Sequence, residues 1–335
     1  MSYVEIQVVS LVCSIEAAPE SHRTPRNEII MPPTLFSNRT FGLCALLVAL
    51  LFLLPFNYVY GEQEESSASE SVRVVTWNIQ WFPGRTPGAS ENAQLAHRAE
   101  VREYLPGLKP DILLLQEIRD DEAAQFLVDS VEGLEMHVAT DFQRPQAHLS
   151  QQIVIASRFP ALAAHMEVFT DIYHDPQTEP YRGFAFTALE APDGGVWLVY
   201  GVHLKSNRGE AEYNIATRQE SARQILEHIE AMVDLYTDQG PIGIIIGGDF
   251  NLLLEREHMA HEETLNIFLD EGFHWSWAGV PFEERVTWPA AGPFPDACFD
   301  HILTRHLPRE TAEVLYKPES ELSDHRPVLL KLEIE

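Results

Sequence analysis

Eight polar side chains in this 335-residue sequence stand where apolar runs end or begin, and their types suit acid–base and metal chemistry. They are carboxylates, carboxamides and imidazoles: Asn78, Glu117, His203, Asp249, Asn251, Asp300, Asp324 and His325. Carboxylate and amide oxygens are the ligands that a hard divalent cation prefers, which favours Mg²⁺, with Mn²⁺ able to replace it. A histidine oriented by a carboxylate is a competent general base near neutral pH. The residue types therefore predict a Mg²⁺ site with a histidine base.

The clearest apolar run is Ile244–Asn251, which reads IIIGGDFN. Its isoleucines and Gly247 predict a strand that is buried on both faces and ends at Gly248. Asp249 and Asn251 are two residues apart, so extended geometry predicts that their side chains point the same way. A buried strand that delivers polar side chains at its carboxyl end is typical of α/β active sites. The structural alternative is an Asx-type turn after an ordinary strand.

The remaining pattern predicts strands and helices in loose alternation, with hairpins among them. Strands are expected at 72–76, 111–117, 135–139, 152–157, 184–189, 196–202, 298–303, 312–316 and 327–332. Helices are expected from about residue 92 to 105 and at 120–128, 211–236 and 264–269. Because no linker interrupts this pattern, we expect one mixed α/β domain with two sheets over residues 71–335.

The residues before this domain are interpreted as a leader. Residues 41–54 are almost wholly apolar, and an acidic Ser/Glu run follows at 62–70, which is the layout of a signal peptide. The run is short for a membrane-spanning helix, which needs about 20 residues. We therefore predict an N-terminal extension and signal peptide at 1–61, with its apolar core at 41–56, and an acidic linker at 62–70. An uncleaved anchor and a start at Met31 remain open, so the protein is expected to be periplasmic, secreted or membrane-anchored.

Charge and cysteine content exclude some functions. The sequence has 23 basic and 51 acidic residues, a formal net charge of −28, which argues against tight non-specific DNA binding. It does not argue against turnover of a phosphate ester at a metal site. Past residue 61 the only cysteine is Cys298, which excludes a disulfide within the domain and a cysteine-built zinc site.

Six short segments stand at the ends of expected strands: TWNI at 76–79, LQE at 115–117, VHL at 202–204, GDFN at 248–251, FDHIL at 299–303 and SDH at 323–325. In this order they resemble the endonuclease/exonuclease/phosphatase superfamily, and the resemblance covers about residues 72–333. Thr287-Trp288 also matches a pair that is common before the fifth segment. The resemblance implies an α/β fold of the α+β type, a four-layer sandwich of two mixed β-sheets packed face to face and flanked by helices.

The resemblance also implies roles for the site residues. Glu117 would be the main metal ligand, with Asn78 and Asp324 close to the same cation. His325 would be the base that activates water, and Asp300 would hold its ring.

Three more residues would act on the substrate. Asp249 and Asn251 would position water and the phosphoryl oxygens, and His203 would stabilise the charged transition state and protonate the leaving group. The sequence departs from the family at Gln80, where relatives often carry an acidic residue, and at Phe299, where a basic residue is common.

Candidate substrate contacts are Arg182, which precedes a strand, and Lys205 and Asn207 in the loop after His203. These side chains could meet a phosphate group, and a surface arginine or a solvated loop is the alternative for each.

Each site residue taken alone also has a structural explanation, such as a turn cap for Asn78 or a core histidine for His203. As a set they favour an exported Mg²⁺-dependent phosphodiesterase, with a nuclease as the first expectation. A phosphatase, or a phospholipid or small-molecule phosphodiesterase of the same fold, is the alternative. A surface binding module with an inactive site is an alternative of another class. We expect a phosphodiester substrate, no protein partner and a monomer.

Overall fold

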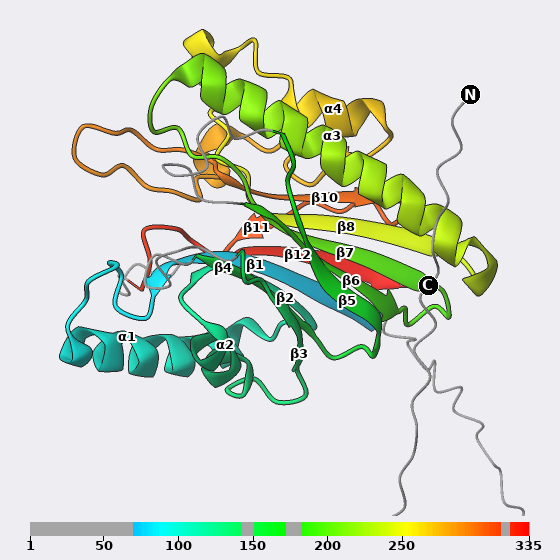
Figure 1. The fold of residues 1–335 in the computed structure, drawn as a ribbon, viewed down its shortest axis with the longest axis horizontal. Helices are drawn as coiled ribbons and strands as arrows, with labels where there is room; N and C mark the ends of the chain where they lie inside the picture. The colour runs from blue at the N-terminus through cyan, green and yellow to red at the C-terminus, as the bar shows by residue number, and fades with distance from the viewer. Residues whose placement is uncertain (1–69, 143–150, 172–181, 316–321, 335) are drawn as a thin grey trace, which may run out of the picture. The chain divides into compact units, whose positions relative to one another are not determined.

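The computed structural model describes residues 70–142, 151–171, 182–315 and 322–334, all within one compact unit that spans Ser66–Glu335. Two six-stranded sheets pack face to face in this unit, and helices cover their outer faces (Figure 1). The predicted four-layer α/β sandwich is therefore confirmed. The expected leader and nearly all of the acidic linker lie outside the described residues, so both stay predictions.

Each sheet mixes parallel and antiparallel pairs. The first sheet has the order β11-β12-β1-β2-β4-β3, with β1 (Glu70–Phe82), β2 (Ile112–Ile118), β3 (Glu135–Ala139), β4 (Gln152–Ser157), β11 (Glu313–Val314) and β12 (Val328–Ile334). The second has the order β5-β6-β7-β8-β10-β9, with β5 (Ala161–Val168), β6 (Gly183–Glu190), β7 (Val196–His203), β8 (Ile242–Asp249), β9 (His274–Trp275) and β10 (Asp300–Arg305).

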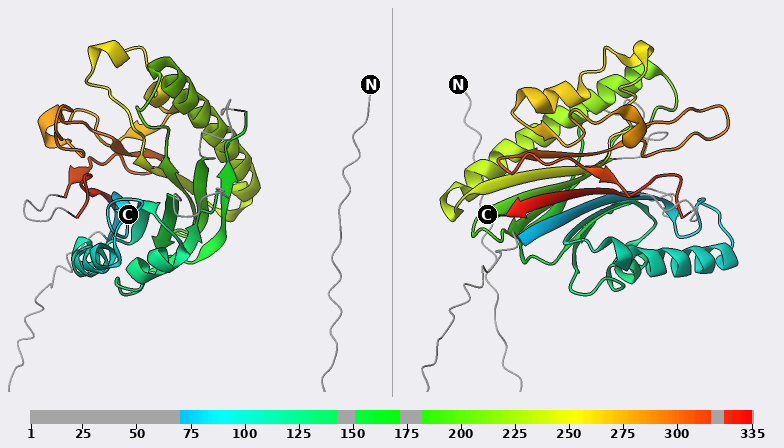
Figure 2. Two further views of the ribbon diagram at one scale, coloured as in Figure 1. Left: turned by 60° about the vertical axis from the view of Figure 1, so that its left-hand side comes forward. Right: turned by 180° about the vertical axis from the view of Figure 1, so that it is seen from behind.

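Two helices cover each sheet, on opposite sides of the sandwich (Figure 2). The first sheet is covered by α1 (Glu91–Tyr104) and α2 (Asp121–Val128), and the second by α3 (Ala211–Tyr236) and α4 (Thr264–Asp270). The Asp120 side chain caps α2 by accepting a hydrogen bond from the Ala123 amide at 2.8 Å, as its place before an apolar run predicts. None of the described helices is long and apolar enough to cross a membrane.

Strand β8 shows why the central strands are apolar throughout. Ile244 and Ile246 point to the outer face, where they pack with Ile225 and Ile229 of α3. Ile245 points the other way, into the core between the two sheets. A strand with a packed layer on each side must be apolar at every position, whereas an alternating pattern marks a strand with one wet face.

The strand connections bring polar residues from both sheets to one edge. Strands β1 and β2 are parallel, as are β7 and β8, so the carboxyl ends within each pair lie together. β10 runs antiparallel to β8, which places its first residue, Asp300, opposite Asp249. β12 runs antiparallel to β1 and begins opposite Thr76, so the residues just before Val328 lie beside the end of β1.

The structure differs from the sequence prediction in several elements: the two-residue strand β9 was not predicted, and β1 continues to Phe82 instead of ending at Thr76. β5 was not predicted, because it is an edge strand with exposed positions on both sides and shows no apolar alternation. β8 does not end at Gly248 but continues to Asp249. The turn at 192–195 joins β6 and β7 into a hairpin, as its Pro-Asp-Gly-Gly sequence predicts.

Candidate active site

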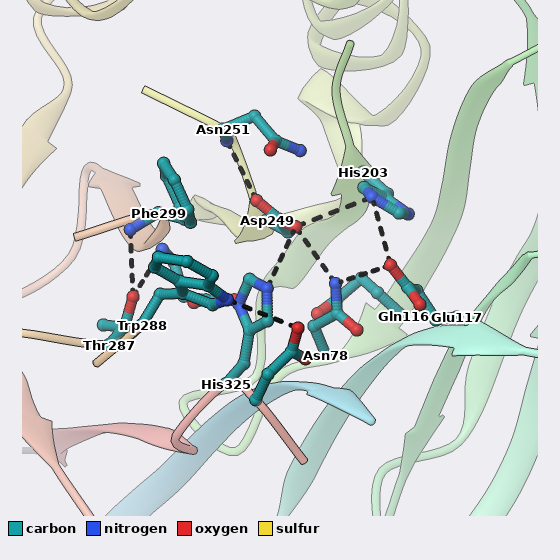
Figure 3. A network of polar contacts seen from close by, with 12 residues as sticks. Asn78, Gln116, Glu117, His203, Asp249, Asn251, Thr287, Trp288, Phe299 and His325 are labelled. Carbon is teal, nitrogen blue, oxygen red and sulfur yellow. Dashed lines mark hydrogen bonds and ion pairs between the residues drawn. The ribbon is translucent and has the colours of Figure 1, made fainter. Parts of the chain in front are cut away.

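The eight predicted site residues meet at the shared edge of the two sheets. Figure 3 shows six of them, Asn78, Glu117, His203, Asp249, Asn251 and His325. Asn78 lies at its centre, fully buried, and its amide links the two sheets. Nδ2 donates to Oε1 of Glu117 at 3.3 Å and to Oδ2 of Asp249 at 3.0 Å, while Oδ1 accepts from the Gln80 amide at 3.0 Å. The amide thus fixes a carboxylate from β2 beside a carboxylate from β8.

Glu117 is held by its backbone as well as by Asn78. Its φ of 63° lies in the left-handed region, which is costly for a side chain with a Cβ and is found at functional sites. Its Oε2 accepts a hydrogen bond from the Trp81 amide at 2.9 Å. Hydrogen bonds from Asn78 and from the Trp81 amide therefore fix both oxygens of the Glu117 carboxylate.

His203, the last residue of β7, faces both of these carboxylates. Its Nε2 lies 3.5 Å from Oδ2 of Asp249 and 3.9 Å from Oε1 of Glu117. This pair of acceptors favours a proton on Nε2. The ring is therefore placed to offset negative charge at the edge or to donate a proton there.

Asp300 and His325 form the shortest side-chain contact among the eight predicted site residues. Oδ2 of Asp300 lies 2.8 Å from Nδ1 of His325, which leaves Nε2 to face Oδ2 of Asp249 at 3.8 Å. Burial lowers the pKa of His325, but the carboxylates of Asp300, Asp249 and Asp324 outweigh it and raise that pKa above its usual value. The arrangement selects one tautomer and one ring orientation, as a general base requires.

The segment that carries His325 is fixed to the end of β1. The indole of Trp77 donates to the His325 carbonyl at 3.0 Å, and the Ser323 hydroxyl donates to the Asn78 carbonyl at 2.7 Å. The indole of Trp288 donates to Oδ2 of Asp324 at 3.3 Å. These contacts give the SDH segment a defined position without secondary structure.

The expectation of extended geometry through Asn251 is wrong, and the alternative, an Asx-type turn after the strand, is what forms. Asn251 has a φ of 56°, and its amide donates to Oδ1 of Asp249 at 2.9 Å, which forms an Asx-type turn. Its own Nδ2 donates to the Leu204 carbonyl at 3.2 Å. The chain turns here because the side chain of Asp249 satisfies the backbone that the strand no longer pairs.

The electrostatics of the edge suit a divalent cation. Burial and the nearby Asp324 carboxylate raise the pKa of Glu117, and burial with the charges of Asp300 and Glu117 raises the pKa of Asp249. Among the described residues, no lysine or arginine forms an ion pair with Glu117, Asp249 or Asp324. The cationic groups that face these carboxylates among the described residues are the imidazoles of His203 and His325, and a bound divalent ion would stabilise the cluster further.

The donor set fits Mg²⁺ better than a softer metal. Oxygens come from Glu117, Asp324 and the Asn78 amide, and the described thiol, Cys298, is buried and does not line the cavity over this edge. In the described part of the chain, the edge carboxylates and histidines do not gather three ligand atoms within 4.8 Å of one another. An open set of this kind suits a cation that keeps several water ligands, as Mg²⁺ does.

A cavity of about 850 Å³ opens over the edge. Of the three predicted substrate contacts, Arg182 and Asn207 line it, whereas Lys205 does not. The guanidinium of Arg182 donates to the His203 carbonyl at 2.8 Å, and Nδ2 of Asn207 donates to the Asn251 carbonyl at 2.7 Å. Both side chains therefore support the site residues as well as facing the cavity.

Other lining residues were not singled out from the sequence as site residues. They include Gln151, Arg256, Phe294 and Pro295, which come from loops and have no motif of their own. Thr287 supports the backbone at the start of β10, because its hydroxyl oxygen accepts hydrogen bonds from the amides of Phe299 and Asp300 at 2.9 and 3.1 Å. Its match to the family pair was the only sequence signal for that contact.

Comparison with known proteins supports the grouping of these motifs. A sequence model of the Endonuclease/Exonuclease/phosphatase family matches residues 75–325. No curated protein matches the chain.

Solved structures share the fold at low sequence identity. An endonuclease/exonuclease/phosphatase from Bacteroides vulgatus has a TM-score of 0.59 at 18% identity, over 79% of this chain and 100% of that one. A humanized TDP2 from D. rerio has a TM-score of 0.58 at 19% identity, over 79% and 99%. An endonuclease/exonuclease/phosphatase from Beutenbergia cavernae has a TM-score of 0.58 at 17% identity, over 79% and 72%.

Proposed function

Because this chain belongs to the Endonuclease/Exonuclease/phosphatase family, we propose that it is a Mg²⁺-dependent phosphodiesterase, with a nuclease as the first choice. Members of this family are generally hydrolases that cleave phosphoesters, and they typically use divalent metal ions. One observation carries the proposal: His325, paired with Asp300, faces Asp249 among buried carboxylates that border a cavity.

In the proposed reaction, a water oxygen attacks phosphorus, and the bond from phosphorus to the leaving oxygen breaks. His325 accepts the water proton at Nε2, because its Nδ1 is engaged by Asp300. His203 offsets charge on the phosphoryl oxygens and gives a proton to the leaving oxygen. Asp249 and Asn251 orient the water and the phosphoryl group, since Asp249 lies between the two histidines.

Glu117, Asn78 and Asp324 are the residues that would hold the cation. Mg²⁺ bound there supplies charge compensation and polarises a phosphoryl oxygen. Asn78 has a second task, because its amide nitrogen holds Glu117 and Asp249 at 3.3 and 3.0 Å and keeps their carboxylates from separating. This fixed spacing supports a reaction in which charge must be stabilised without rearrangement of the protein.

The lining of the cavity supports a substrate with both a phosphate and a flat or apolar part. Arg182, Arg208 and Arg256 are cationic lining residues, and Trp288 and Phe294 are aromatic ones. Phe294 is 63% exposed, which leaves its ring available for stacking on a base. A nucleotide unit satisfies both halves of this lining, and so does a phosphodiester with an apolar group, which keeps the second substrate class as the alternative.

A substrate panel tests the proposal. The purified protein would be incubated with Mg²⁺, or with a chelator, and with plasmid DNA, bis-p-nitrophenyl phosphate and p-nitrophenylphosphorylcholine. Mg²⁺-dependent nicking supports the nuclease. Turnover of a small diester without nicking supports the alternative, and no Mg²⁺-dependent turnover of any of the three contradicts the proposal.

We also propose that the protein is exported and acts as a monomer. The apolar run at 41–54, followed by the acidic run at 62–70, supports export. Fractionation of cells, with N-terminal sequencing of the mature protein, tests export. Retention of the unprocessed chain in the cytoplasm would contradict it, and sedimentation of a dimer would contradict the monomer.

A further inference from the structure

A second group of metal-type ligands lies on the outer face of the second sheet. His165 and Glu167 come from the edge strand β5, and His228 comes from α3, which covers that face (Figure 1). Among the described residues, this group has three ligand atoms that all lie within 4.8 Å of one another. His165 and Glu167 are two apart on a strand, so both side chains lie on the same face.

This group is separate from the edge that carries the candidate active site. His165 pairs across the sheet with Phe186, and Phe186 pairs with Tyr200 of β7. Tyr200 precedes His203 by three residues, which is about 10 Å along a strand and puts the two side chains on opposite faces.

The distances match a metal centre built on two imidazoles. Nε2 of His165 lies 3.2 Å from Nε2 of His228, and 3.8 Å from Oε1 of Glu167. Two nitrogens bound to one tetrahedral Zn²⁺ at about 2.05 Å are separated by about 3.3 Å. The carboxylate needs only a small side-chain rotation to join them, and Glu167 is exposed enough to make it.

The two rings are already held in place. Nδ1 of His228 lies 3.0 Å from the hydroxyl of the buried Tyr200, which leaves Nε2 to face His165. The His228 ring contacts Phe184 and Phe186 edge-on, with centroids 5.1 and 4.9 Å away, and His165 lies 4.8 Å from Phe186. A second hydrogen bond that fixes the orientation of the ring is a regular feature of metal-binding histidines.

We propose that His165, Glu167 and His228 form a site for a nitrogen-preferring transition dication of the Zn²⁺ class, with water in the remaining position. Two imidazoles and one carboxylate select Zn²⁺, Co²⁺, Ni²⁺ or Cu²⁺ over Mg²⁺, which prefers oxygen. The bound ion would tie the edge strand β5 to α3, so its effect would be on stability. This inference does not depend on the proposed phosphodiesterase activity.

Metal titration of the untagged, metal-stripped protein tests the site. Zn²⁺ would be added in excess Mg²⁺ and followed by calorimetry and by the rise in melting temperature, and Co²⁺ by its visible absorption. We expect one equivalent to bind and the melting temperature to rise by roughly 5 °C or more. His165→Ala should abolish both effects, and Tyr200→Phe should weaken binding by about tenfold or more.

Matched variants separate this site from other histidines. His261→Ala removes an exposed imidazole that lies 3.2 Å from Glu212 and belongs to no three-ligand group among the described side chains, and it should leave Zn²⁺ binding unchanged. Glu167→Gln changes an exposed side chain, so weakened binding in that variant cannot be ascribed to unfolding. The proposal is overturned if the protein binds no Zn²⁺, if Glu167→Gln and His165→Ala bind it as the wild type does, or if binding is lost in Glu117→Gln alone.

Discussion

At the scale of single residues, the contact between Asp300 and His325 decides whether His325 can serve as the proposed base. Asp300 fixes the ring through Nδ1, and its charge is the largest of the contributions that raise the pKa of His325. The same contact therefore orients the base and makes it harder to deprotonate. The base form is favoured when positive charge, such as a bound cation, offsets the neighbouring carboxylates.

The pH profile of Asp300→Asn tests this double role. The histidine acts as a base only when neutral, so activity rises with pH through its pKa. Removal of the Asp300 charge lowers that pKa, and the acid limb of the profile should move to lower pH. The maximal rate should fall by on the order of a hundredfold or more, because the ring loses its orientation. An acid limb that stays in place would show that Asp300 does not set the charge state of the base.

At the scale of elements, a buried ion pair fixes the loop after β7. Arg218 of α3 and Glu262 are both buried, with N–O distances of 2.6 and 2.8 Å. Nη1 of Arg218 also donates to the Lys205 carbonyl at 2.8 Å. Helix α3, the segment before α4 and the loop at 205–208 are thus joined at one guanidinium.

Glu262→Gln should be strongly destabilising, because it leaves the Arg218 charge buried without its partner. A loss of about 3–5 kcal/mol in the free energy of unfolding is expected from chemical denaturation. Glu220→Gln, which removes an exposed partner of Arg223, is the control and should change stability by less than about 0.5 kcal/mol. Equal effects in the two variants would contradict the assigned role.

His97 of α1 joins the two segments that flank the site. Its Nδ1 accepts from the Gly84 amide at 2.9 Å, and its Nε2 lies 2.7 Å from the Leu322 carbonyl, three residues before His325. Burial, with a smaller contribution from Arg85, lowers the pKa of His97 to about 4, against the raising effect of the Leu322 contact. The neutral ring matches this pattern, since Nδ1 can accept only without a proton.

The stability of the protein should fall in acid partly because of His97. Its pKa is about 6.5 in the unfolded chain and lower in the folded one, so the unfolded chain binds the proton more readily. The contribution is complete above pH 6.5 and is lost as pH falls toward 4, by roughly 2–3 kcal/mol. Urea denaturation at neutral and acid pH should show a shallower pH dependence in His97→Gln. An unchanged slope would refute this assignment.

The elements with strong periodicity were predictable from the sequence, and the weak ones were not. The helix at 211–236 and the strands at 135–139 and 152–157 have the predicted bounds, because each shows a regular apolar pattern. The Ala-rich edge strand β5 has no such pattern and was not predicted. The group of His165, Glu167 and His228 was therefore not predicted either, because two of its members lie on β5. Motif order grouped the eight site residues, and the Asx-type turn at Asn251 is a local contact that the sequence left open as an alternative. The Asn78 bridge could not be predicted, because it depends on a contact between distant segments.

At the scale of the whole molecule, the net charge of −28 sets how a polyanion approaches. A negative protein repels DNA most strongly at low ionic strength, where screening is weakest. The KM for DNA should therefore stay level or fall as NaCl rises from low concentration, with turnover of a small diester as the control. A steep rise in KM with salt, as for basic DNA-binding proteins, would contradict this expectation.

The most direct test of the account is Mg²⁺-dependent hydrolysis of bis-p-nitrophenyl phosphate by the wild type, Asp249→Asn and Asp270→Asn. Asp249 contacts Asn78 and faces both histidines, whereas Asp270 is an exposed residue at the end of α4. We predict that Asp249→Asn lowers kcat by about a hundredfold or more while Asp270→Asn matches the wild type. Equal turnover by all three proteins would place the activity elsewhere and contradict the account.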